Sequence, residues 1–150
     1  MDEKVFVKIC GLTNADDARV AIDSGADLLG MVFHIHSKRI CEIAAAQKII
    51  ELNLVKPKVL VFGHDDIDYI MNIYTLLRGL MTFLQIPANH EYYDKIEELV
   101  TPTRIIPSIA VNAPLTDFDL ERWSSNSLII LDNAAGFGVD GKPVAGGTGV

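Results

Sequence analysis

The stretch VFVKICGLT, residues 5–13, decides how this chain of 150 residues is interpreted. A short apolar run ends there in Cys10, and the glycine that follows is typical of a buried strand entering a turn. In parallel sheets and barrels, ligands bind beyond the carboxyl ends of the strands, so a side chain at such an end faces the site. Cys10 is therefore a candidate reacting group, although a free cysteine taken alone is more often a small core residue.

The same strand-then-turn pattern recurs along the chain. Apolar runs alternate with segments of helical periodicity, which predicts repeated βα units. Pro107 lies inside one of the runs and lacks an N–H group, so we expect that strand to bulge or fray. The expected strands are 5–10, 28–33, 58–62, 81–86, 104–111 and 127–132, and the expected helices are 14–24, 43–52, 66–80, 91–100 and a weak one at 118–123.

Composition favours a single cytoplasmic enzyme domain. The hydrophobic fraction of 49% is enough for a core, and no apolar run reaches the roughly 20 residues of a membrane helix. The net charge of −7 argues against nucleic-acid binding, because such proteins need a basic face. Two cysteines make neither a disulfide framework nor a zinc pattern, and His34 and His36 lack a third ligand, so no metal is expected.

A second candidate reacting group follows the last apolar run. Residues 128–131 read LIIL and are followed by Asp132 and then by a glycine-rich stretch. A thiol and a carboxylate at two strand ends make a plausible acid/base pair.

Several segments in the same order resemble the phosphoribosylanthranilate isomerase family, which catalyses an Amadori rearrangement in tryptophan biosynthesis. They are KICGLT at 8–13, GADLLGMVF at 25–33, SKR at 37–39, LD at 131–132 and GGTG at 146–149. The resemblance implies an α/β fold, the (β/α)8 TIM barrel, here as about six βα units in one partial domain over residues 1–150. It implies a small phosphorylated substrate and no cofactor.

The resemblance also implies roles for individual residues. Asp132 would act as general acid on the ring oxygen of the aminoribose, and Cys10 would remove the proton from C2. Arg39 would pair with the anthranilate carboxylate, a task suited to a forked guanidinium, although a solvated loop arginine is the alternative. Strand alternation places Lys8 on the same face as Cys10, and a rim lysine paired with an acid is the alternative there. The expected substrate-binding residues are Arg39, Lys8, Gln85, Gly146 and Gly147.

Departures from the family pattern leave other functions open. The family barrel has eight strands, so we expect a truncated chain whose open sheet edges favour self-association. The loop at 33–39 lacks the prolines common in the family, which predicts a less rigid loop and a less well aimed Arg39. The alternatives are a related barrel enzyme acting on another phosphorylated sugar and a non-catalytic barrel remnant.

Overall fold

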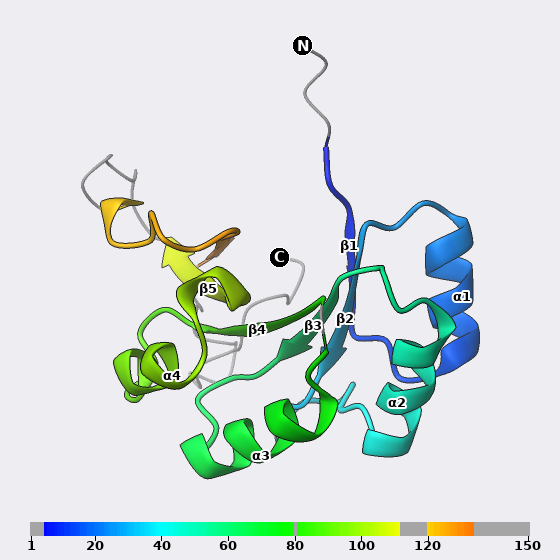
Figure 1. Cartoon of the computed structure of the whole chain (residues 1–150), viewed down its shortest axis with the longest axis horizontal. Coiled ribbons are helices and arrows are strands. Elements are labelled where there is room, and N and C mark those ends of the chain that lie inside the picture. The colour runs from blue at the N-terminus through cyan, green and yellow to red at the C-terminus, as the bar shows by residue number, and fades with distance from the viewer. Residues whose placement is uncertain (1–4, 80, 112–119, 134–150) are drawn as a thin grey trace, which may run out of the picture. The chain divides into compact units, whose positions relative to one another are not determined.

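The structure is a computed structural model that describes residues 5–79, 81–111 and 120–133. The chain divides into two compact units, Met1–Gln85 and Ile86–Val150, which are described one at a time. Strands and helices alternate from β1 to β5, as the sequence predicts (Figure 1). The elements are β1 (Lys8–Cys10), α1 (Ala15–Asp23), β2 (Leu28–Val32), α2 (Ile43–Leu52), β3 (Lys58–Val61), α3 (Ile67–Leu77), β4 (Thr82–Pro87), α4 (Tyr93–Leu99), the 3-10 turn Pro102–Arg104, β5 (Ile105–Val111) and β6 (Ile130–Asn133).

In the first unit, β1, β2, β3 and β4 lie side by side in chain order and run parallel. Paired residues of neighbouring parallel strands point to the same face, so the register sorts the side chains into two faces. The Cys10 face comprises Lys8, Cys10, Leu28, Gly30, Val32, Val59, Val61, Phe83 and Gln85. The opposite Ile9 face includes Leu29, Met31, Leu60 and Leu84, all fully buried.

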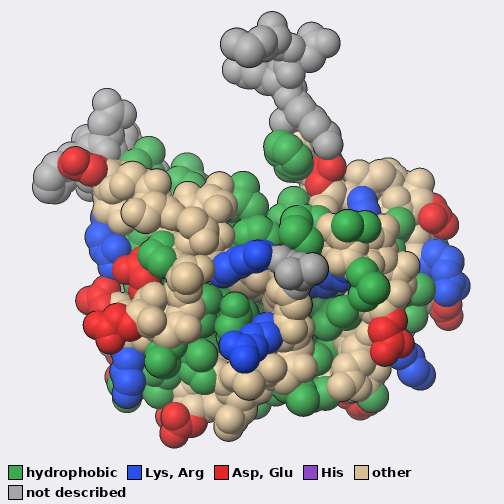
Figure 2. All heavy atoms as spheres, viewed as in Figure 1, with side chains coloured by type: hydrophobic (Ala, Val, Ile, Leu, Met, Phe, Trp, Pro, Cys, Tyr) green, Lys and Arg blue, Asp and Glu red, His purple; other side chains and the backbone are tan. Residues whose placement is uncertain are grey.

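Capping residues begin two of the helices of this unit where the sequence predicts. The side chain of Asn14 accepts a hydrogen bond from the Asp17 amide over 2.8 Å and caps α1. Asp66 caps α3 in the same way, through the Asp68 amide. Helix α1 is followed by Gly25, whose φ of +91° suits a residue after a helix end. The outer surface of α1 bears side chains of both charges, visible on the right of Figure 2.

Two element boundaries in this unit differ from the prediction. Strand β1 begins at Lys8 rather than Val5, because Val7 bonds the loop before β2: its amide donates to Asp27 Oδ2, and its carbonyl accepts from the Asp27 and Leu28 amides. Helix α3 ends at Leu77, since Arg78 adopts an extended conformation. The start of β1 therefore depends on partners about 20 residues away, which periodicity does not contain, whereas the end of α3 is a local change of backbone conformation.

The second unit contains α4, β5 and β6. Strands β5 and β6 are parallel, with Ser108 opposite Ile130 and Ala110 opposite Asp132. Strand β6 begins at Ile130 rather than at 127, because its ladder with β5 starts where Ile130 pairs with Ser108. Before the strand, the Ser127 hydroxyl donates to the carbonyl of Thr103. Of the weak helix expected at 118–123, residues 120 and 121 are helical and residues 118 and 119 lie outside the described part.

Two expectations for this unit are corrected. Helix α4 begins at Tyr93 rather than at 91, because the Tyr92 amide donates to His90 Nδ1 in the preceding turn. Pro107 neither bulges nor frays β5, which continues through it from Ile105 to Val111. The pairing with β6 starts only at Ser108, so the missing N–H of Pro107 interrupts no bond of that ladder.

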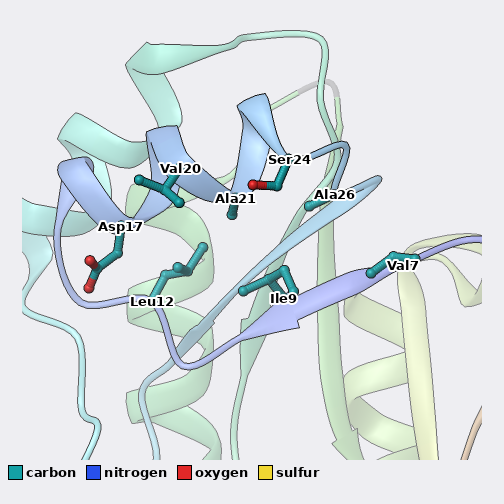
Figure 3. A pocket seen from close by; sticks show the side chains of 8 residues that line it. All are labelled: Val7, Ile9, Leu12, Asp17, Val20, Ala21, Ser24 and Ala26. Atoms are coloured by element: carbon teal, nitrogen blue, oxygen red, sulfur yellow. The ribbon is translucent and has the colours of Figure 1, made fainter.

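An apolar groove runs beside β1, whose only sheet neighbour among the described residues is β2. The groove has a volume of about 340 Å³ and lies between β1 and α1 (Figure 3). Ile9 and Leu12 point toward α1, and Val20 of that helix is exposed at the rim. Its lining residues are Val7, Ile9, Leu12, Asp17, Val20, Ala21, Ser24 and Ala26. No helix among the described residues has the length and hydropathy needed to cross a membrane.

Candidate active site

The carboxyl end of β1 brings Cys10 and Lys8 together over a glycine of the neighbouring strand. A Cβ placed on Gly30 would lie 2.9 Å from Cys10 Sγ and 3.2 Å from Lys8 Cε. Both side chains therefore occupy space that any larger residue at position 30 would fill. The expectation that Lys8 shares the face of Cys10 is confirmed, and the two side chains are close as well.

Arg39 lies at the same strand end. Its Nη1 donates to the carbonyl oxygen of Cys10 over 3.0 Å, although 28 residues separate the two positions along the chain. Gly11 makes this approach feasible, because a Cβ there would lie 2.3 Å from Arg39 Nη1. Gly11 also has a φ of +87°, a conformation that side-chain-bearing residues rarely adopt. Arg39 is exposed, so most of its donors face outward.

Gln85 belongs to the same face of the first unit. It pairs with Val61, which pairs with Val32, so its side chain is on the Cys10 face. Its Oε1 is buried and has no hydrogen-bond partner among the described residues. A buried amide oxygen without a donor is costly, and in binding sites a ligand often supplies that donor.

Asp132, the proposed partner of Cys10 in the acid/base pair, lies on a strand of the second unit. It is the third residue of β6, is half-buried and lies opposite Ala110 of β5. Asp132 therefore lies within the predicted strand, one residue before the last residue of β6 rather than at its end. Gly146 and Gly147, the remaining expected substrate contacts, lie outside the described residues.

The two cysteines have different environments. Cys41 is 3% exposed, and burial together with the Glu42 carboxylate raises the pKa of its thiol to about 11. It therefore stays a thiol at neutral pH and behaves as a core residue. Cys10 is half-buried at the end of its strand, so a reagent or substrate can approach it.

Sequence reasoning missed a carboxylate that fixes the loop leading to Arg39. Asp65 is buried and accepts hydrogen bonds from His34 Nδ1 and from the backbone amides of Ile35 and Gly63. The only signal was its place in the turn after a strand, which many loop acids share. Within the described residues, no three His, Cys, Asp or Glu side chains gather as a ligand set for a metal ion.

The comparisons with known proteins match the chain to one family. The family model for N-(5'-phosphoribosyl)anthranilate isomerase matches residues 7–149, which is nearly the whole chain. The chain belongs to the phosphoribosylanthranilate isomerase family. The resemblance inferred from the sequence motifs is thereby confirmed, and with it the α/β TIM-barrel fold class.

Individual phosphoribosylanthranilate isomerases agree. The enzyme of Geotalea daltonii is 43% identical over 70 residues, which are 45% of this chain and 33% of that protein. The crystal structure from Thermus thermophilus has a TM-score of 0.69 at 24% identity and shows the shared fold, covering 86% of this chain and 62% of the other. A further isomerase, in complex with reduced 1-(o-carboxyphenylamino)-1-deoxyribulose 5-phosphate, has a TM-score of 0.57 at 33% identity and covers 79% and 59%.

The chain is shorter than these phosphoribosylanthranilate isomerases. The matched residues make up about three fifths of the length of the solved structures and about a third of the Geotalea protein.

Proposed function

We propose that the chain acts in the Amadori rearrangement of N-(5'-phosphoribosyl)anthranilate, the reaction for which its family is named. The observation that carries the proposal is the cluster at the end of β1, where Lys8 flanks the Cys10 thiol and Arg39 bonds the Cys10 carbonyl. Membership of the isomerase family supports the assignment of this cluster to that reaction. The activity is proposed for the whole protein to which these residues belong.

The proposed mechanism is proton transfer between the substrate and two side chains. Asp132, in its protonated form, gives a proton to the ring oxygen of the aminoribose, and the bond from that oxygen to C1 breaks. The substrate nitrogen forms a double bond to C1, and the Cys10 thiolate then removes the proton from C2. The resulting enolamine tautomerises to the ketone, the 1-(o-carboxyphenylamino)-1-deoxyribulose 5-phosphate. General acid or base groups of this kind contribute about 10² to 10⁴ each to the rate.

Other residues would hold the substrate. The Cys10 carbonyl holds Arg39 through Nη1, and the guanidinium would pair with the anthranilate carboxylate. Gln85 has a buried Oε1 that would accept a hydrogen bond from a substrate hydroxyl. Lys8 lies beside the Cys10 thiol and would contact the substrate there. Gly146 and Gly147 would contact the substrate through their backbone amides.

Genetic complementation tests the function. A tryptophan-requiring strain that lacks the isomerase would receive the 150-residue chain, or the same chain joined to the carboxyl-terminal third of a solved relative. Growth with either form that depends on both Cys10 and Asp132 is the expected result. Growth with neither form would contradict the proposal and favour one of the two alternatives from the sequence.

Those alternatives are separated by binding. A barrel enzyme for another phosphorylated sugar would bind a sugar phosphate without the anthranilate ring as tightly as the anthranilate conjugate. A non-catalytic remnant would bind neither. The isomerase assignment requires that the carboxylated aromatic ring strengthens binding, because Arg39 would contribute only there.

The proposal extends to the domain, its location and its partners. Residues 1–150 would form one partial barrel domain in the cytoplasm, with a second copy of the chain as a partner. Among the described residues, no strand pairs with the edge of β1 that faces away from β2, so this edge offers backbone groups to another strand. The groove between β1 and α1 offers apolar surface beside it (Figure 3). Two copies that paired through this edge would remove Val7, Ile9 and Val20 from water.

A further inference from the structure

The loop that carries Arg39 is held at its beginning by one buried carboxylate. Asp65, in the turn between β3 and α3, accepts from His34 Nδ1 over 3.0 Å and from the Ile35 amide over 3.1 Å. The Gly63 amide donates to the same carboxylate over 2.8 Å. The Asp65 side chain is 1% exposed, so these donors replace the water that an ionised carboxylate would otherwise bind.

Close contact between the loops after β2 and β3 makes this bond network feasible. A Cβ on Gly63 would lie 2.6 Å from His34 Nδ1, so the imidazole fills the space that glycine leaves. The Tyr69 hydroxyl adds a second link, donating to the Phe33 carbonyl over 2.9 Å. Burial and the Asp65 carboxylate both raise the pKa of Tyr69, which keeps this hydroxyl a donor.

From His34 the loop reaches Arg39 through a short series of local bonds. The Ser37 amide donates to the His34 carbonyl over 2.9 Å, and the Arg39 amide donates to Ser37 Oγ over 3.1 Å. Beyond Arg39, the Cys41 amide returns to the Val32 carbonyl of β2. The direction of the guanidinium therefore depends on where the loop starts, and Asp65 fixes that start.

We infer that Asp65 and His34 are positioning residues that aim Arg39 at the carboxylate of an aromatic substrate. The bonds between Asp65 and His34 restrict the conformation of the loop before the ligand binds, as prolines would in a stiffer loop. The inference rests on the proposed function, in which Arg39 holds that carboxylate. It adds that selectivity for a carboxylated ring depends on a buried acid that does not touch the ligand.

The experiment compares two ligands on the 150-residue chain. One is reduced 1-(o-carboxyphenylamino)-1-deoxyribulose 5-phosphate, and the other is the same molecule without the ring carboxyl. The readout is the ratio of their dissociation constants, obtained by titration calorimetry. A loss of folded protein or of general affinity changes both constants together, so it leaves the ratio unmoved. The wild-type chain is expected to prefer the carboxylated ligand by roughly ten- to hundredfold, the range of a charged hydrogen bond.

The variants distinguish a change in the direction of the Arg39 side chain from a change in the stability of the fold. Asp65→Asn removes the charge, and His34→Ala removes the imidazole but leaves Asp65 in place; each should lower the preference several-fold. His34→Asn should restore it, because the amide nitrogen of asparagine lies as many bonds from Cα as Nδ1 does. The matched control is Asp66→Asn, which removes the same charge one residue further on and keeps a good cap for α3. It should leave the preference unchanged.

The outcomes distinguish the proposed role of Arg39 from the positioning role of Asp65 and His34. If the wild-type chain shows no preference, or if Arg39→Ala leaves the preference intact, the proposed role of Arg39 fails and the positioning inference fails with it. If Arg39→Ala abolishes the preference while Asp65→Asn and His34→Ala keep it, the proposed function stands and only the inference is overturned. Combining Asp65→Asn with Arg39→Ala should add nothing to the loss from Arg39→Ala alone, because one residue acts through the other.

Discussion

Arg39 reaches across the turn after β1 and donates from Nη1 to the carbonyl oxygen of Cys10 over 3.0 Å, with its guanidinium packed against Gly11. This contact joins the residue proposed to remove a proton to the residue proposed to hold the substrate ring. It also ties the loop after β2 to the end of β1. Changes at Gly11 should therefore affect ligand binding as well as folding.

Gly11→Ala should weaken ligand binding, and Gly25→Ala should not. Both glycines have positive φ, so an alanine at either position should destabilise the fold by about 1 kcal/mol or more. A Cβ on Gly11 collides with the Arg39 guanidinium, whereas nothing lies within 4 Å of one on Gly25. Urea unfolding would measure stability, and titration with the carboxylated product analogue would measure binding. Equal loss of affinity in both variants would contradict the proposed contribution of Arg39.

Cys10→Ser and Asp132→Asn should each lower turnover by about 10² to 10⁴ in a form of the protein that supports growth. The substitutions keep size nearly constant, so affinity for the product analogue should change little. Steady-state kinetics would separate the effect on kcat from the effect on KM. A variant that retained a near-normal kcat would remove its residue from the proposed mechanism. Cys41→Ala is the matched control for the loss of a thiol, and its kcat should stay close to that of the wild-type chain.

Iodoacetamide should label Cys10 and spare Cys41 at pH 8. With a pKa of about 11, about one Cys41 thiol in a thousand is ionised at that pH, and the residue is buried besides. Mass spectrometry of the labelled peptides would give the two rates, with Cys10→Ser and Cys41→Ala identifying each site. Rapid labelling of Cys41 in the folded chain would show that its burial is not maintained in solution.

The same raised pKa predicts a loss of stability at alkaline pH. Cys41 keeps its proton more tightly in the folded chain than in the unfolded chain. Its contribution to stability is therefore complete below about pH 9 and is lost as the pH rises through about 11. Urea unfolding at pH 8 and at pH 10.5 should show a smaller alkaline loss in Cys41→Ala than in the wild-type chain. An identical loss in the two proteins would assign the alkaline effect to other groups.

Val20→Lys should reduce self-association. Val20 is 64% exposed at the groove between β1 and α1, and a lysine there would place a charge on the proposed contact. Leu76→Lys is the control, because Leu76 is similarly exposed on α3 at 58% and does not line the groove. Sedimentation velocity over a range of concentrations would follow the association. A wild-type chain that stayed monomeric at every concentration would overturn the proposed self-association.

The order and type of the elements can be predicted from the sequence, because each rests on short-range patterns. The Asn14 and Asp66 caps, the glycine after α1 and the alternation that puts Lys8 on the face of Cys10 are all visible within a few residues. The element ends that it missed, at Val7 and Arg78, depend on backbone bonds and conformations that periodicity does not contain. Family motifs supplied the candidate residues, and those motifs are equally local.

The contacts that hold the candidate residues of the first unit are visible only in the folded chain. Arg39 bonds Cys10 across 28 intervening residues, and Asp65 bonds His34 and Ile35 across about 30. The Oε1 atom of Gln85, which has no hydrogen-bond partner among the described residues, likewise depends on what surrounds it in the folded chain. The physical reason is that hydrogen-bond geometry and desolvation depend on distances between strand ends, which packing sets and local sequence does not. The sequence shows that the loop lacks prolines. It does not show that a buried carboxylate bonds the first residues of the loop.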